Sequence, residues 1–372
     1  MQVNDLIHGF RVRERHTLPE IGATLWRMEY EYNGADLIWL ERPDDNKTFA
    51  IAFKTIPQDD TGVFHILEHS VLNGSEKYPV REPFVELLKS SLSTFLNAFT
   101  FPDKTMYPVS SRNSVDFLNL MDVYLDAVLH PLCVKDDHAF LQEGWHYEPG
   151  EDGTVTVNGV VFNEMKGDYS NPESRLRQTL LRCLFPDMAY GCSSGGDPAH
   201  IPELTYEQYC ASHARFYHPS NSRIVLDGEI DLDAALAKLD SFLRDFPRID
   251  PDADIPMQAP VSRSETAYYE IGPEERTEKK ALLARGWVYG RFDEPEKSVA
   301  INALAGGGLF PAHSVGWNRR RTAGHQAWHH GDCRRYCHQQ MRRQQCGQMP
   351  HGCYSFQKCA AFLPQTRKRM AA

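Results

Sequence analysis

The 372-residue sequence lacks several features that would assign it to a class at once. No apolar run approaches the ~20 residues needed to cross a bilayer, and the opening "MQVNDLIHGFRVRERH" lacks the apolar stretch of a secretory signal. This segment is also neither rich enough in serine nor poor enough in acids for an organelle transit peptide. Cysteine is sparse over residues 1–306, where four scattered thiols predict reduced, mostly buried side chains. We therefore expect a cytoplasmic protein with no membrane partner.

Acidic residues are almost missing from the end of the chain. Residues 307–372 contain eleven Lys and Arg but one acid, Asp332, whereas residues 1–306 carry a net charge of −20. The acidity of the earlier part would attract cationic peptides over long range, although many cytosolic proteins are acidic without such a role.

Residues 307–372 also hold five of the nine cysteines, without the paired spacing of structural zinc sites. A disordered basic arm is one interpretation, and a zinc module is another. We favour a third, in which the segment is read out of frame after about residue 306. Apolar periodicity stops there in mid-domain, and a mixture of Arg, Gln, His, Cys and Ala is typical of a GC-rich gene read in the wrong frame.

The sequence does contain a pair of histidines in an apolar segment, "TGVFHILEHSVLNG". Its apolar spacing predicts a helix, with Asp60 or Thr61 capping the start and Gly74 ending it. The expected helix therefore carries two imidazoles and a carboxylate, which are groups that can take part in metal binding and catalysis.

His65 and His69 stand four positions apart, so on a helix they are neighbours, roughly 5–6 Å apart at Cβ. Glu68 lies on the same side. Two neutral nitrogen ligands and one carboxylate base are what a metal-hydrolysis site needs from a single helix. The alternative is a pair of core-edge histidines beside a solvated glutamate, because H-x-x-E-H also occurs by chance.

Zinc would need a third protein ligand, and the histidine segment offers none. Downstream, "LQEGWHYE" provides Glu143 and His146, and "GVVFNEMKGDYS" provides Glu164. Spacing cannot choose among these three residues, because the third ligand can come from any helix that packs nearby. Carboxylates behind the ligands should also orient the two imidazoles, but the sequence does not name them.

Short strands and helices alternate irregularly along the chain. "ATLWRMEYEYNGADLIWLE" predicts a hairpin around Asn33-Gly34, and further strands are expected at "KTFAIAFKT" and "SRIVLDGEI". Helices are expected at "SVDFLNLMDVYLDAVLHPL", at Pro172 after Asn171, and after the N-caps Thr205 and Asp231. This mixture, without regular βαβ units, predicts an α+β fold with helices packed on an antiparallel sheet.

Composition divides the chain into four predicted segments. These are an N-terminal domain over residues 1–245, a Pro- and Asp-rich linker over 246–265, the start of a second α+β domain over 266–306, and the aberrant tail over 307–372. In the second domain, strands are expected at "ETAYYEIG" and "KKALLARGWVYG".

A family resemblance is carried by "HILEHSVLNGSEKYPVREPFVELLKSSLSTFLNAFTFPDKTMYPV" followed by "GVVFNEMKGDYS". These stretches resemble the presequence-protease branch of the pitrilysin/insulysin zinc metallopeptidases, which carry the inverted motif His-x-x-Glu-His. The resemblance runs from about residue 5 to about residue 305 and includes "EGWHYE", "GGDPAHIPELTYEQY" and "YHPSNSRIVLDGEIDL". It implies that His65, His69 and Glu164 hold one Zn²⁺ per chain.

The same resemblance implies how the site would act. Glu68 would be the general base, and "STFLNAFTFPDKTMYPV" would be an edge strand that binds substrate by strand addition. Backbone groups of Asn97, Ala98 and Phe99 would supply most of the hydrogen bonds. Without the resemblance, an ordinary amphipathic strand explains this stretch equally well.

The function that the resemblance implies is a zinc metalloendopeptidase that degrades unstructured, presequence-like peptides. In full-length relatives two halves of one chain close around a chamber, and Arg and Tyr residues of the second half bind substrate. This chain ends before those residues, so we expect little activity from it alone. The competing class is a non-catalytic scaffold subunit of the same fold, and a nucleic-acid partner for the basic tail is not expected.

Overall fold

The computed structural model describes residues 1–80, 90–272, 280–288, 294, 296–297 and 299–300, together with the backbone of residues 317–321. It divides into two compact units, Met1–Lys166 with Met188–Pro256, and Gly167–Asp187 with Met257–Ala372. Apart from residues 317–321, the predicted tail lies outside the described residues. Within the described part, no helix is both long enough and apolar enough to cross a membrane.

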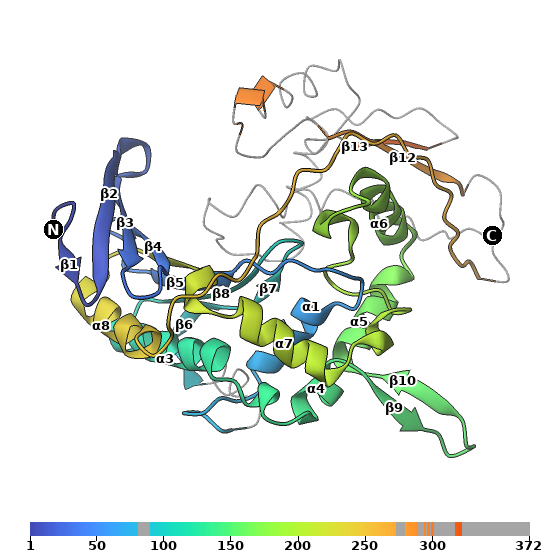
Figure 1. The fold of residues 1–372 in the computed structure, drawn as a ribbon, viewed down its shortest axis with the longest axis horizontal. Coiled ribbons are helices and arrows are strands. Elements are labelled where there is room, and N and C mark those ends of the chain that lie inside the picture. The colour runs from blue at the N-terminus through green and yellow to red at the C-terminus, as the bar shows by residue number, and fades with distance from the viewer. Residues whose placement is uncertain are drawn as a thin grey trace. The chain divides into compact units, whose positions relative to one another are not determined.

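The first unit is built on one nine-stranded sheet (Figure 1). Its strand order is β1-β2-β3-β4-β11-β5-β8-β6, and the short β7 also pairs with β8. The strands are β1 Leu6–Ile7, β2 Phe10–Leu18, β3 Ala23–Tyr30, β4 Asp36–Glu41, β5 Lys47–Phe53, β6 Ser93–Leu96, β7 Phe99–Thr100, β8 Thr105–Ser111 and β11 Ser222–Asp227.

The α+β class predicted from the sequence is confirmed, and the sheet is mixed. β4 and β11 run parallel, with Leu37 opposite Ile224, while the other neighbouring strands are antiparallel. β11 comes much later in the sequence than β4 and β5 but inserts between them in the sheet, parallel to β4. Its alternating burial places Ile224 and Leu226 in the core.

The predicted hairpin around Asn33-Gly34 is present as β3 and β4, with Trp26 opposite Trp39. Gly34 takes the left-handed conformation at φ 80° that the turn requires. Asn33 is fully buried, and its side-chain amide donates to the carbonyl oxygens of Leu243 and Phe246 at 2.8 and 3.1 Å. The turn residue therefore also ties the hairpin to the last helix of the unit.

The helices of the first unit form two groups. α3 (Ser114–Leu129) packs against α8 (Leu232–Leu243) and against strands β5 and β8. α1 (Val63–Val71) packs against α4 (His138–Glu143) and α7 (Tyr206–Phe216), and it also contacts β7 (Figure 1). A separate hairpin, β9 (His146–Pro149) with β10 (Val155–Asn158), projects from the unit and leads into α5 (Val160–Tyr169).

Local capping signals were read correctly at three helices. Thr205 caps α7 in a capping box with Gln208, and the carboxylate of Asp231 accepts from the Ala234 amide at 3.2 Å to cap α8. Asn171 caps α6 (Pro172–Leu184), and Pro172 occupies the first turn.

The predicted caps of α1 are wrong. The N-cap is Gly62, in a left-handed conformation at φ 70°, with no side-chain hydrogen bond. Asp60 and Thr61 are used elsewhere, because the Asp60 carboxylate accepts from the Ser193 amide at 2.6 Å and Thr61 donates to Asp59. The helix ends at Val71, before Gly74.

In the second unit, α6 packs against β12 (Leu282–Gly286), which pairs with β13 (Trp317–Arg321). The expected strand in "KKALLARGWVYG" is therefore present as β12. The expected strand at "ETAYYEIG" is wrong, since residues 247–272 contain neither helix nor strand. Alternating apolar residues do not form a strand by themselves, because a strand needs a neighbouring strand to pair with.

Candidate metal centre

Helix α1 presents His65, Glu68 and His69 as its spacing predicts, and α5 brings Glu164 to the two imidazoles. The Oε2 atom of Glu164 lies 3.8 Å from Nε2 of His65 and 3.9 Å from Nε2 of His69. The two rings stand edge to face, 4.9 Å apart at their centroids. The His65 side chain is 11% exposed but Glu164 is 55% exposed, so the cluster opens to solvent on the α5 side.

The donor set suits zinc. Three ligand atoms, one from each residue, lie within 4.8 Å of one another. In a tetrahedral site with ligand distances of about 2.0–2.1 Å, such atoms are about 3.3 Å apart. The Glu164 oxygen, at 3.8 and 3.9 Å from the two imidazole nitrogens, is within about 0.6 Å of that separation, and its exposed side chain is free to adjust. Two neutral imidazoles and a carboxylate are also among the ligand types that zinc prefers.

The ring of His65 is fixed by a main-chain carbonyl. Its Nδ1 lies 3.0 Å from the carbonyl oxygen of Gly195. A carbonyl only accepts, so the proton of the neutral ring is on Nδ1 and the lone pair is on Nε2, which faces Glu164.

Gly195 belongs to a glycine pair that packs tightly against the start of α1. A Cβ on Gly62 would lie 2.7 Å from the carbonyl oxygen of Gly195, and one on Gly196 would lie 3.2 Å from the Cα of Gly62. Gly62 is at φ 70° and Gly196 at φ 99°, conformations that other residues rarely adopt. Glycine at both positions lets the loop approach the helix that bears the two histidines.

The ring of His69 meets a carboxylate instead. Its Nδ1 lies 3.2 Å from Oε2 of Glu143, a buried residue at the end of α4. Burial lowers the pKa of His69, but the bond to Glu143 and the charges of Glu68, Glu143 and Glu164 outweigh it, so the pKa is raised. Burial raises the pKa of Glu143, and its bonds to His69, Asn73 and Gln142 more than reverse this, so the pKa is lowered.

Glu68 is held by the neighbouring strand. Thr100, in β7, donates its hydroxyl to Oε2 of Glu68 at 2.8 Å and lies 3.4 Å from the carbonyl of Phe64. Among the described residues, Thr100 is the one side-chain donor to this carboxylate. The sequence reasoning missed Thr100, although it directly follows the Asn97–Phe99 stretch that the reasoning singled out.

That stretch lies at the margin of the sheet. β6 is the last strand of the sheet path, and Phe99 of β7 pairs with Met106 of β8. The Asn97 amide donates to Pro108 at 3.2 Å, while the Ala98 amide donates to the side chain of Asn97 at 2.9 Å. Because Thr100 joins β7 to Glu68, this edge lies directly beside the carboxylate of α1.

The two other candidate ligands from the sequence are placed differently. Glu143 contacts the back of His69, on the nitrogen away from Glu164. His146 lies at the start of β9, where its Nδ1 donates to the carbonyl of Leu141 at 2.8 Å. Neither residue is part of the cluster of three ligand atoms.

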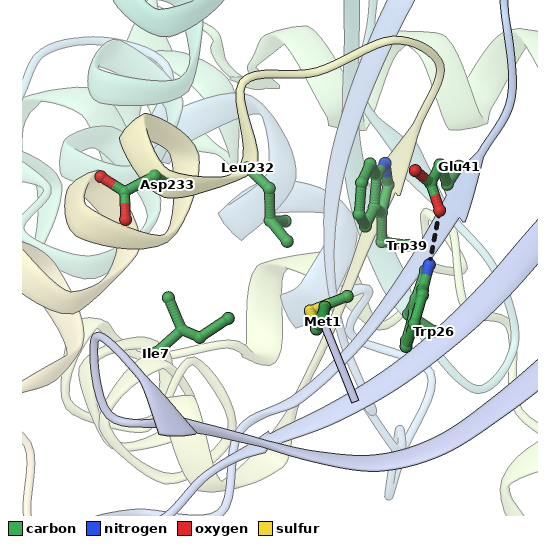
Figure 2. Close-up of a pocket in the computed structure, with 7 residues that line it drawn as sticks. All are labelled: Met1, Ile7, Trp26, Trp39, Glu41, Leu232 and Asp233. Atoms are coloured by element: carbon green, nitrogen blue, oxygen red, sulfur yellow. Dashed lines mark hydrogen bonds between the residues drawn. The ribbon is translucent and has the colours of Figure 1, made fainter. Parts of the chain in front are cut away.

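A cavity of about 330 Å³ lies elsewhere in the first unit (Figure 2). It is lined by Met1, Ile7, Trp26, Trp39, Glu41, Leu232 and Asp233, none of which belongs to the metal cluster. Its polar side chains are already paired, since the Trp26 indole donates to Glu41 at 2.8 Å, the Trp39 indole donates to the Gly228 carbonyl at 3.3 Å, and Asp233 contacts His8 at 2.9 Å. The cavity offers no convergent chemistry.

Comparison with protein families assigns the chain. Residues 57–140 match the model described as insulinase (peptidase family M16), and residues 203–306 match the peptidase M16 inactive domain. The chain belongs to the insulinase family, peptidase family M16. The first match contains His65, Glu68 and His69.

Within this family, the chain is similar to several curated proteins. It is 48% identical over 307 residues to protein HypA of Clostridium perfringens, covering 81% of this chain and 31% of that protein. It is 50% identical over 241 residues to presequence protease 1, chloroplastic/mitochondrial, of Arabidopsis thaliana, covering 64% of this chain and 22% of the relative. The chain thus spans less than a third of the length of these relatives.

A solved structure shares the fold. The crystal structure of pitrilysin matches with a TM-score of 0.54 and 18% sequence identity, over 68% of this chain and 26% of that chain. Together with the mixed sheet and its flanking helices, this likeness confirms the fold class that the sequence resemblance implied.

Proposed function

We propose that this chain carries the catalytic site of a zinc metalloendopeptidase that degrades unstructured peptides. The observation that carries the proposal is the convergence of one ligand atom each from His65 and His69 of α1 and from Glu164 of α5, with Glu68 on the same helix as the two histidines. The relatives named presequence proteases support the substrate class.

His65, His69 and Glu164 would hold the zinc. Zinc bound there would supply Lewis-acid chemistry, which lowers the pKa of water and polarises a peptide carbonyl. The Nδ1–H bond to the Gly195 carbonyl keeps the Nε2 lone pair of His65 directed at the ligand cluster.

Glu68 would be the general base. Its carboxylate accepts the proton of the attacking water and later returns it to the amine that leaves. The Thr100 hydroxyl fixes one carboxylate oxygen at 2.8 Å, which limits the rotation of the group and presents the other oxygen for proton transfer.

The peptide would lie along the edge formed by β6 and β7. Strand addition uses main-chain groups near Asn97, Ala98 and Phe99, so it reads few side chains and suits a broad range of unstructured peptides. Thr100 follows Phe99 and touches Glu68, so a peptide paired here would pass beside the general base. Hydrolysis is fast only if the scissile peptide bond is held in a fixed position relative to Glu68.

The chain spans less than a third of the length of these relatives, so we propose that these 372 residues by themselves bind zinc but hydrolyse peptides slowly. A cytoplasmic location also remains a prediction, since the relatives' names include mitochondrial and chloroplastic proteins.

The test uses a fluorogenic unstructured peptide and the chain mixed with the separately expressed second half of a presequence protease. We expect hydrolysis by the wild-type mixture, and a loss of about 10²- to 10⁴-fold in Glu68→Gln with zinc content unchanged. The control is Glu76→Gln, because Glu76 is an exposed glutamate that pairs with Lys135. This variant should keep the wild-type rate of hydrolysis and the wild-type zinc content.

Two outcomes would overturn the proposal. Wild-type activity in Glu68→Gln would assign the base to another residue. A zinc-loaded wild-type mixture that cleaves no peptide would instead favour the non-catalytic scaffold.

A further inference from the structure

The carboxylate of Glu143, a buried residue at the end of α4, lies among three hydrogen-bonding side chains. Its Oε1 accepts from the Asn73 amide at 2.9 Å and from the Gln142 amide at 3.0 Å. Its Oε2 lies 3.2 Å from Nδ1 of His69. The residue is only 8% exposed, so three donors and two oxygens are matched within the protein interior.

The two histidines of the cluster therefore have unlike supports. His65 relies on a main-chain carbonyl, that of Gly195, whereas His69 relies on the side chain of Glu143. His69 is also the more exposed of the two, at 25% against 11% for the side chain. Its ring orientation consequently depends more on this one contact.

The tautomer of His69 matters for its role. A neutral imidazole carries one N–H, so a lone pair at Nε2 requires the proton at Nδ1. A carboxylate accepts from both of its oxygens, so it can take the Nδ1–H of His69 on one side and the two amide donors on the other. The Asn73 amide, in the turn after α1, locks the carboxylate in that orientation.

We propose that Glu143 is a positioning residue for His69: it holds the ring with Nδ1 protonated and Nε2 directed at Glu164. This inference rests on the proposed metal site. The motif "LQEGWHYE" thereby gains a function different from the direct ligation that the sequence left open.

Glu143→Gln is the sharpest substitution because it keeps the shape and removes one acceptor. The carboxamide has one oxygen and one NH₂ group, but all three surrounding groups donate. If the oxygen turns to the two amides, the NH₂ faces His69 and favours the wrong tautomer. Asn73→Asp combined with Glu143→Gln supplies an acceptor for the NH₂ group and leaves the carboxamide oxygen for His69.

The experiment measures two properties of the full chain labelled with ¹⁵N-histidine. The first is the tautomer of His69 in zinc-free protein, at a pH well above the raised pKa of the ring so that it is neutral, from long-range ¹H–¹⁵N correlations assigned with His69→Ala. The second is the zinc dissociation constant, from competition with a chelator. We expect Glu143→Gln to reduce the Nδ1–H form of His69 and to weaken zinc about 10- to 100-fold, and the double variant to restore the tautomer.

The matched control is Glu203→Gln. Glu203 also contacts a histidine Nδ1 at 3.2 Å, that of His200, but outside the metal cluster. This variant should leave the zinc affinity and the His69 tautomer unchanged.

A wild-type His69 tautomer and zinc affinity in Glu143→Gln, even with a lower melting temperature, would overturn the proposal and leave Glu143 as a packing residue. If wild-type protein bound no zinc, the proposed function would fail. The tautomer measurement would still decide the role of Glu143, because it is made without metal.

Discussion

His213 should make the first unit sensitive to acid. It lies on α7, its Nε2 donates to the carbonyl of Val128 at 3.0 Å, and its ring stacks on Tyr217 at 4.9 Å. Burial lowers the pKa of His213 from 6.5 to about 4, and the nearby His130 also disfavours the charge. The folded protein therefore binds fewer protons at this site than the unfolded chain does.

The sign and size of the effect follow from this difference. Stability is complete above pH 6.5 and is lost as the pH falls toward 4, because the unfolded histidine is protonated first. Each pH unit in that interval costs about 1.4 kcal/mol, so the whole interval costs about 3 kcal/mol, of which about 2 kcal/mol is lost by pH 5.

The assay is urea unfolding followed by tryptophan fluorescence at pH 7 and pH 5. His213→Gln keeps an N–H donor for Val128 but cannot titrate, so it should lose about 2 kcal/mol less than the wild type between these pH values. Equal losses in the two proteins would refute the reasoning. α7 contacts α1 through Phe216 and Phe64, whose ring centroids are 5.1 Å apart, so acid should also loosen the helix that bears His65 and His69.

Two further predictions concern the metal cluster. Glu164→Gln should weaken zinc binding by more than about 100-fold in chelator competition, since it removes a proposed ligand; unchanged affinity would return that role to Glu143 or His146. Gly62→Ala should destabilise the unit by about 1–3 kcal/mol and also weaken zinc, because its Cβ would collide with the Gly195 carbonyl that holds His65. The control is Gly22→Ala, because Gly22 is also in a left-handed conformation, at φ 62°, but has open space around it. This variant should be destabilised only by the left-handed backbone, by about 1–2 kcal/mol, and should keep the wild-type zinc affinity. An equal loss of zinc affinity in Gly62→Ala and Gly22→Ala would contradict the proposed effect of the Gly195 contact.

Features that depend on short segments could be predicted from the sequence. The i, i+4 spacing of His65 and His69 placed both rings on one helix face, and the caps Asn171, Thr205 and Asp231 followed from local hydrogen bonding. The hairpin at Asn33-Gly34 likewise followed from turn chemistry.

Features that depend on distant contacts could not. Residue spacing left Glu143, His146 and Glu164 equivalent, and it was the family resemblance that favoured Glu164, because only the approach of α4 and α5 to α1 separates the three. The cap of α1 was misread for the same reason. Asp60 accepts a hydrogen bond from the Ser193 amide, more than a hundred residues later in the chain. Gly62 is needed because the loop that follows Ser193 passes close to the start of α1. The parallel entry of β11 into the sheet also has no local signal.

The zinc content of the purified chain, determined by mass spectrometry for wild type and His69→Ala, decides whether these residues form a metal site. We expect about one zinc per chain in the wild type and almost none in the variant, because two remaining ligands hold the ion poorly. A variant that retained one zinc per chain would remove His69 from the site.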